Sequence, residues 1–202
     1  MKILALELST AVGSLAWRDA EVECVRDWPN DRKDSAAFFK NLQVVRRQFG
    51  APETMIVGLG PGSYAGTRIA ISAAIGMQLS SHARLIGWPS ICAMECSAEE
   101  YCVIGDARRN SFFFARVRKN ALIEGPNLFS GPDLKPKLKS FGSDMPVFSS
   151  EILAQCDRPI LRFPSALVLA RLAGEPGHGF FLPPLEPIYM RAPHITMPAT
   201  GT

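Results

Sequence analysis

The sequence predicts an α/β protein built from two related lobes, and three features support this. The chain opens on three consecutive strand-like segments, as in an antiparallel meander. A short apolar segment at 55–57 then leads through a glycine-rich loop into an apolar helix. About half a chain after the first strand, a second apolar segment again reaches an acidic residue, turns and re-enters a hydrophobic strand. The repeated design predicts an N-terminal lobe at 1–98 and a smaller C-terminal lobe at 99–202.

Composition restricts the possible functions of the chain. Its 202 residues are 47% hydrophobic, and its net charge of +3 is too even to indicate a nucleic-acid-binding domain. Glu7 interrupts the first apolar run, so we expect no secretory signal. No other stretch approaches the roughly 20 apolar residues of a membrane span, so we expect no such span either. The five cysteines follow no zinc spacing, and we expect free thiols in a reducing cytoplasm.

The first lobe is expected to begin with strands at 3–8, 12–18 and 20–27. A helix follows, capped by Asp34 or Ser35 and ending near Gln48, with Phe38 and Leu42 on its apolar stripe. Phe39 lies beside that stripe, either at its edge or on a second, partner-facing surface.

The helix predicted at 65–80 is apolar nearly all round, so it must be covered on several sides. One face carries small residues that allow another helix to approach closely: Ala70, Ala73, Ala74 and Gly76. A partner helix would account for both properties.

The rest of the chain is predicted in less detail. We expect a strand at 84–87, a short helix at 89–97, strands at 101–106 and 112–117, and about one helix among turns between 120 and 141. Short strands at 146–149 and 159–162 and a helix at 165–173 follow, and after Arg191 we expect a loose tail.

The glycine-rich loop has the setting of a phosphate-binding turn. Residues 60–65, GPGSYA, satisfy the dinucleotide-binding pattern, but no acidic residue follows at the distance that a ribose requires. A Walker loop would need Lys where Thr67 follows Gly66, and Pro61 has no N–H to donate. A tight turn that packs the helix closely is favoured over a phosphate cradle, which stays open as the alternative.

Catalytic patterns are scarce. His82, His178 and His194 are isolated in the sequence and show no metal-ligand spacing. Ser63 does not lie in a G-x-S-x-G turn, and spacing nominates no acid/base pair. We therefore predict no catalytic residue, no metal site and no cofactor.

Several segments together resemble one family. The opening ILALELST, the loop and helix GLGPGSYAGTRIAISAAIGMQL with LIGWPSI after it, the turn DARRNSFFFARV and the near-terminal PIYMR are similar to the bacterial TsaB (YeaZ) proteins. These proteins serve in threonylcarbamoyladenosine modification of tRNA. The resemblance extends in order over nearly the whole chain.

The resemblance implies an actin-like ATPase fold (ASKHA, RNase H-like) of two related α/β lobes. It also implies a non-catalytic relative of the subunit that modifies adenosine 37 of tRNAs reading ANN codons. That catalytic subunit has an H-x-x-x-H pair on an N-lobe helix, whereas this chain has no histidine before His82.

The resemblance further implies the partners. The first two helices would pack against the same helices of a catalytic TsaD-type subunit, or of a second copy, and a TsaE-type ATPase subunit would join there. tRNA would be contacted only through the complex, without any membrane. The implied interface residues are Phe38, Phe39, Leu42, Tyr64, Arg68, Ala70, Ala73, Ala74 and Met77.

The implied nucleotide-site turns depart from the family pattern. Glu7 stands where an aspartate is usual, Asp34 replaces a histidine, and the turn after Asp106 lacks glycine, although its arginines could still grip an anion. These degenerate turns comprise Glu7, Ser9, Thr10, Gly60, Gly62, Asp106 and Arg108.

Three alternatives remain. A stand-alone actin-fold ATPase or phosphotransferase would use the Ser9–Thr10 and Asp106 turns around Mg-ATP. A peptidase would need a metal or nucleophile constellation, which the sequence does not offer. A divergent paralogue could keep the fold and bind a different partner.

Overall fold

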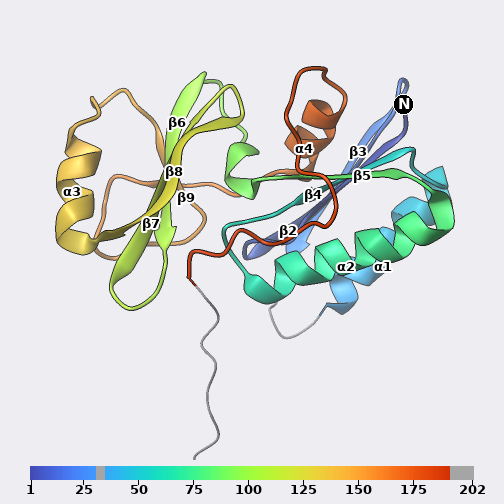
Figure 1. The fold of residues 1–202 in the computed structure, drawn as a ribbon, viewed down its shortest axis with the longest axis horizontal. Helices are drawn as coiled ribbons and strands as arrows, with labels where there is room; N and C mark the ends of the chain where they lie inside the picture. Colours follow the sequence, from blue (N-terminus) through green and yellow to red (C-terminus); the bar gives the residue numbers. More distant parts are fainter. Residues whose placement is uncertain (31–34, 192–202) are drawn as a thin grey trace, which may run out of the picture.

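The computed structural model describes residues 1–30 and 35–191, which form two five-stranded sheets set side by side (Figure 1). The strand order is β3-β2-β1-β4-β5 in the first sheet and β10-β9-β6-β7-β8 in the second. Within these described residues, no helix combines the length and the apolar character needed to cross a bilayer.

The first lobe begins with an antiparallel meander and continues with parallel crossovers. Its elements are β1 (Ile3–Glu7), β2 (Val12–Arg18), β3 (Glu23–Pro29), α1 (Ala36–Phe49), β4 (Thr54–Gly58), α2 (Tyr64–Ser81) and β5 (Arg84–Trp88). β4 pairs in parallel with both β1 and β5. All residues of β1 and β4 are buried, as expected for strands with helices on both faces of the sheet. The strands and helices predicted between residues 3 and 88 are confirmed, with the third strand at 23–29 rather than 20–27.

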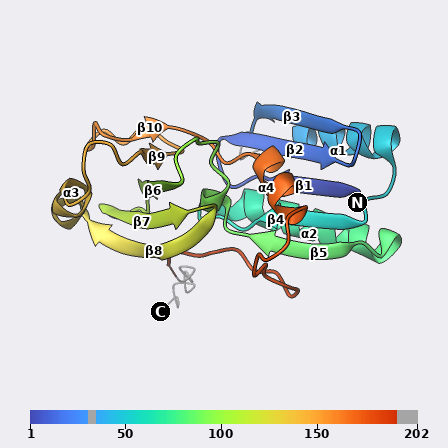
Figure 2. The ribbon, with the colours of Figure 1, turned by 90° about the horizontal axis from the view of Figure 1, so that it is seen from above.

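Helices α1 and α2 lie side by side on one face of the first sheet (Figures 1 and 2). α1 buries the predicted stripe, including Phe38 and Leu42, and α2 buries Ala70 and Ala74 against the same core. The opposite face is covered by α4 (Ala166–Ala173), whose Leu169 is completely buried.

The second lobe repeats the topology of the first. Its elements are β6 (Glu100–Asp106), β7 (Ser111–Arg118), β8 (Ala121–Ser130), α3 (Gly131–Lys139), β9 (Val147–Ser149) and β10 (Ile160–Leu161). β6 pairs antiparallel with β7 and parallel with β9, as β1 does with β2 and β4. The predicted two-lobed α/β fold is therefore confirmed.

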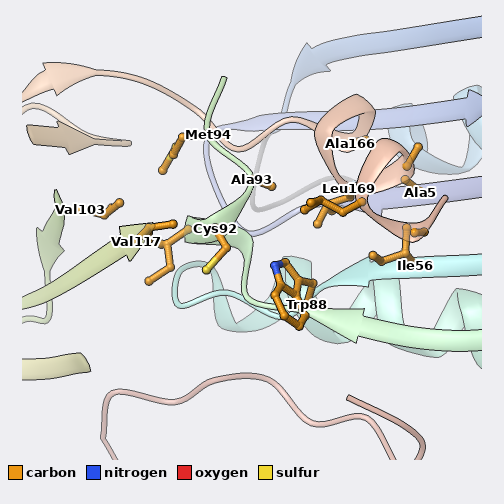
Figure 3. Packing of buried hydrophobic residues seen from close by; sticks show 14 of the residues in the cluster. Ala5, Ile56, Trp88, Cys92, Ala93, Met94, Val103, Val117, Ala166 and Leu169 are labelled. Carbon is orange, nitrogen blue, oxygen red and sulfur yellow. The ribbon is translucent and has the colours of Figure 1, made fainter. Parts of the chain in front are cut away.

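The two sheets share one hydrophobic core around the 3-10 helix η1 (Ser90–Cys92). Figure 3 shows Ala5 and Ile56 of the first sheet, Val103 and Val117 of the second, and Leu169 of α4 in this cluster. The indole N–H of Trp88 donates to the carbonyl of Asn120 across the junction, at 2.8 Å. Because the lobes bury apolar surface in common, neither has a separate core at this junction.

Two element predictions were wrong. The helix expected at 89–97 is only the single turn η1, because Pro164 bridges to Met94 and the backbone there is extended. Between 120 and 141 the prediction missed β8, an edge strand that includes Gly125 and Pro126. An edge strand tolerates proline because one side of its backbone is unpaired.

The predicted lobe boundary and helix cap need correction as well. Residue 98 separates the two sheets, but α4 packs on β1, β2 and β4, so the predicted second lobe, 99–202, includes a helix of the first. Ser35 precedes α1, yet its hydroxyl makes no capping hydrogen bond. The other predicted cap, Asp34, lies outside the described residues, as does the tail after Arg191.

Candidate functional site

A cavity of about 890 Å³ lies between the two lobes. Its wall comprises the β1–β2 turn, the loop before α2, the β6–β7 turn, residues 150–151, the C-terminal segment 187–191 and single residues of other elements. Most of the predicted nucleotide-site residues fall on these segments, so the structure brings them together: Ser9, Thr10, Gly62, Asp106 and Arg108. Glu7 does not line the cavity.

Glu7 lies beneath the β1–β2 turn and is completely buried. Its Oε1 accepts a hydrogen bond from the backbone N–H of Ser9 at 2.6 Å, whereas Oε2 has no partner among the described residues. A Cβ on Gly58 would come within 1.8 Å of that oxygen, so the carboxyl group occupies the space beside this glycine. Burial raises the pKa of Glu7, which therefore supports the turn rather than presenting charge to the cavity.

Three N–H groups of the glycine-rich loop donate hydrogen bonds inside the chain. Gly60 donates to the Ser90 hydroxyl at 2.8 Å, and Ser63 donates to the carbonyl of Ser9 at 2.6 Å. The Ser63 hydroxyl accepts from Gly66 and so caps α2. A phosphate cradle needs free donors, and these three groups are already engaged.

Close packing explains the glycines of this loop. A Cβ on Gly62 would lie 2.1 Å from the carbonyl oxygen of Ser9, and one on Gly66 would lie 2.1 Å from that of Leu8. The start of α2 thus rests directly on the β1–β2 turn. The geometry favours the tight-turn interpretation of the sequence.

The β6–β7 turn supplies charge to the cavity. The Asp106 carboxylate accepts a hydrogen bond from the backbone N–H of Arg108 at 2.7 Å. It also forms an ion pair with the guanidinium of Arg108 at 3.2 Å. Glu151 accepts from the N–H of Asp106 at 2.7 Å. Arg108, Arg109 and Asn110 all have positive φ, an uncommon backbone for arginine. Both acidic groups therefore hold the turn in place.

The C-terminal segment connects the lobes along the cavity. Ile188 donates its N–H to the carbonyl of Leu59 at 2.7 Å, and the Tyr189 ring lies 5.3 Å from that of Tyr64. Arg191 donates from Nη2 to the Ser111 hydroxyl at 2.7 Å. Sequence reasoning did not place these residues in the site, and their only signal was the near-terminal PIYMR segment.

The predicted partner-interface residues divide into two groups. Five of them are buried in the core of the chain itself: Phe38, Leu42, Ala70, Ala74 and Met77. Both helices turn these side chains toward the first sheet, so the chain by itself does not present them to a partner. A charged substitution at Ala74 would accordingly disturb folding rather than pairing.

The outer face of the two helices presents other residues. Phe39 and Tyr64 are about half exposed, and Arg68 is exposed and stacks over the Tyr64 ring, which also lines the cavity. Ala73 is half-buried and packs against the core rather than facing outward. The interface prediction omitted Ile75 and Leu79, whose exposed fractions are 43% and 78%. Ile75 and Leu79 are four residues apart, and Ser72 precedes Ile75 by about one turn, so the three lie on one face of α2. This spacing could have indicated the outer face.

The histidines do not converge. His82 ends α2 with a left-handed backbone, and His178 packs against Trp88 with ring centroids 5.8 Å apart. His194 lies outside the described residues. Across 1–30 and 35–191, no group of three or more His, Cys, Asp or Glu side chains could hold a metal ion.

Comparisons with known proteins agree with the fold. The structure is similar to a crystal structure from Pseudomonas aeruginosa described as an uncharacterized protein with similarity to the peptidase YeaZ, with a TM-score of 0.72 and 19% identity over 94% of this chain and 99% of that one. A structure of YeaZ from the same organism gives a TM-score of 0.69 and 18% identity over 86% and 90% of the two chains. The chain therefore has a YeaZ-like fold.

Sequence comparison also finds relatives, although no protein-family model matches the chain. An uncharacterized protein of Mycobacterium leprae is 27% identical over 145 residues, which is 70% of this chain and 38% of that protein. An uncharacterized protein of Mycobacterium tuberculosis is 25% identical over 148 residues. The match covers 70% of this chain and 65% of the M. tuberculosis protein, so the chain spans less than two thirds of either relative.

Proposed function

We propose that this chain is a non-catalytic subunit that binds a TsaD-type threonylcarbamoyl transferase and supports formation of N6-threonylcarbamoyladenosine at position 37 of ANN-decoding tRNAs. The observation that carries the proposal is the apolar outer face of α1 and α2, on a YeaZ-like fold. Phe39, Ile75 and Leu79 expose apolar surface there, and a Cβ on Gly76 would meet nothing within 4 Å. Such a face suits a helix that approaches closely.

The charge of this face favours a different partner chain over a second copy. Neither helix contains an acidic residue, while α1 carries Lys40, Arg46 and Arg47 and α2 carries Arg68. Pairing two copies through this face would bring like charges together, at a cost of several kcal/mol if they were juxtaposed. We therefore expect a partner with an apolar helical surface flanked by Asp and Glu.

The cavity between the lobes supports an accessory role over an ATPase. Glu7 is buried below it, and the N–H groups of Gly60, Ser63 and Gly66 in the loop before α2 are bonded within the chain. Both Asp106 and Glu151 accept hydrogen bonds from backbone N–H groups of the β6–β7 turn or its strand. An ATPase would instead direct such groups at a metal ion and phosphates.

The proposal is tested by measuring threonylcarbamoyladenosine in bulk tRNA by nucleoside mass spectrometry. Cells that lack this protein should lose the modified nucleoside, and the wild-type gene should restore it. Unchanged modification in the deleted strain would overturn the proposed function.

The expected partner preference is tested by analytical ultracentrifugation of the purified chain. Alone, the protein should sediment as a monomer at low salt, where repulsion between like charges is least screened. A stable dimer that dissociates on Ile75→Glu would contradict the preference for an acidic partner without affecting the nucleoside result.

A further inference from the structure

We infer that the cavity between the lobes binds a small organic anion without a metal ion, its oxyanion held by Arg109 and Arg191 and its apolar part held by the cavity wall. The inference does not depend on the proposed tRNA function. It uses the cavity, whereas partner binding uses the outer face of α1 and α2.

The charged side chains that line the cavity differ in whether another residue of the chain pairs with them. The two acidic residues that line the cavity, Asp106 and Glu151, are engaged with the β6–β7 turn. Arg108 pairs with Asp106, but no ion pair or side-chain hydrogen bond of Arg109 is found within residues 1–30 and 35–191. The three arginines and two acidic residues that line the cavity leave it a net positive charge.

Arg191 is the second arginine that we assign to the anion. Its Nη2 is held by the Ser111 hydroxyl, which fixes the guanidinium beside the start of β7. Its Nε is buried and has no hydrogen-bond partner among the described residues. A buried donor on a charged group without an acceptor is costly, and an anion in the cavity would supply the acceptor. Two guanidinium groups suit the planar or tetrahedral oxyanion of a carboxylate or phosphate.

The apolar lining gives the ligand its second feature. Between the arginines, both lobes and the C-terminal segment contribute hydrocarbon surface, from Ile91, Ile104, Phe113, Pro187, Ile188 and Met190. A volume of about 890 Å³ falls within the range of small-molecule sites, roughly 300–1,000 Å³. A lone inorganic anion would leave this wall uncovered, so the ligand should combine an oxyanion with an apolar body.

A metal-nucleotide complex fits these groups less well. The carboxylate that could approach a cation from the first lobe, Glu7, is buried and its pKa is raised. The described residues also offer no cluster of three metal ligands. The anion is therefore expected to contact the arginines directly.

The test uses the fluorescent aromatic sulfonate 1-anilinonaphthalene-8-sulfonate and, as its uncharged counterpart, N-phenyl-1-naphthylamine. The sulfonate should bind with one site per chain, and Arg109→Gln and Arg191→Gln should each weaken it about tenfold or more, the usual scale for a charge-assisted contact. Binding of the uncharged probe should change less than twofold. Arg84→Gln, at an exposed arginine outside the cavity, is the matched control and should change neither.

Methyl NMR locates the probe, because the sulfonate could also settle on the outer face of α1 and α2. The Met190 resonance, in the cavity, should shift on titration, while that of Met55, buried in the first sheet, should not. Arg109 lies in a surface turn, so its variant keeps the test valid if Arg191→Gln destabilises the fold.

Competition then identifies the oxyanion. Displacement of the sulfonate by phenyl phosphate, by benzoate or by both would support the inference and assign the preferred anion. Three results would overturn it: equal binding by Arg109→Gln and Arg84→Gln, an unmoved Met190 resonance, or micromolar displacement by ATP only when magnesium is present. The last would instead favour a stand-alone ATPase.

Discussion

The two lobes share a strand order but differ in how the fourth strand reaches the fifth. In the first lobe, β4 leads through the glycine loop into α2, an 18-residue helix, before β5. In the second, the chain from β9 to β10 contains no helix (Figure 2). The same sheet topology therefore presents a pair of adjacent helices in one lobe only.

This difference separates two tasks. The first lobe exposes Ile75 and Leu79 on α2, whereas the helix of the second lobe, α3, buries Leu134 and Leu138 and exposes lysines. The second lobe instead contributes the charged β6–β7 turn of the cavity. Contact with a partner would thus use the first lobe alone, whereas binding of an anion would use the cavity that both lobes line.

Leu169→Ala should have the largest effect on stability, because Leu169 is fully buried where α4 meets the core that both sheets share. We expect a loss of about 2–5 kcal/mol in the free energy of unfolding. Tryptophan fluorescence reports the first lobe, which holds Trp17, Trp28 and Trp88, and far-UV circular dichroism reports both. The two urea transitions should coincide in wild type and variant; separate transitions would show that the lobes unfold independently.

Gly62→Ala should be the next largest change. Its Cβ would lie 2.1 Å from the carbonyl oxygen of Ser9, and backbone at both sides leaves little room to relax. We expect destabilisation of about 1–3 kcal/mol by urea denaturation. An unchanged midpoint would mean that α2 does not rest on the β1–β2 turn as described.

Gly76→Ala is the matched control in the same helix, and it should act in the opposite direction. A Cβ there meets nothing within 4 Å, and alanine favours helix by about 1 kcal/mol. The isolated chain should therefore become more stable in thermal denaturation. If the outer face binds a closely packed helix, the same variant should bind its partner more weakly; tighter binding would argue against a close approach.

Glu7 and Glu100 should contribute to the pH dependence of stability with opposite signs. Burial raises the pKa of Glu7, so its contribution is fully present below the unfolded value near 4.5 and is lost as pH rises through the folded pKa. Arg116 and Arg118 lower the pKa of Glu100, so its contribution is present above the unfolded value and is lost as pH falls.

Substitution by glutamine separates the two effects. Compared with wild type, Glu7→Gln should be more stable at pH 8 and similar at pH 4. Glu100→Gln should be slightly less stable at pH 8 and similar near pH 3, since its ion pairs with Arg116 and Arg118 are partly exposed and such pairs are weak. Urea midpoints measured across this pH range test both expectations. A change in stability of the opposite sign would contradict the pKa direction given for that residue.

The sequence was sufficient for the fold where hydrophobic pattern and turn chemistry agreed. The meanders, the glycine loop and the apolar α2 were predicted from such agreement, and the structure confirms them. β8 was missed because an edge strand with Gly125 and Pro126 has the composition of a turn. The place of α4 could not be read, because a long-range contact with the first sheet leaves no local pattern.

The site was predictable in part. The residues of the two cavity turns were chosen correctly as neighbours, since the paired lobes place their turns opposite each other. The outer face of α2 was misassigned because a helix apolar nearly all round gives no moment to orient it, and small residues were taken to mark the partner side. Ala70 and Ala74 are small because the sheet lies against them.

The most direct test of the account compares two exposed isoleucines, one in each lobe. Ile75 on α2 and Ile123 on β8 have the same exposed fraction, 43%, so a glutamate at either should cost the isolated chain little stability. Co-purification with the TsaD-type subunit should be lost with Ile75→Glu and retained with Ile123→Glu. Retention by both variants, or equal loss by both, would contradict the assignment of the partner surface to α1 and α2.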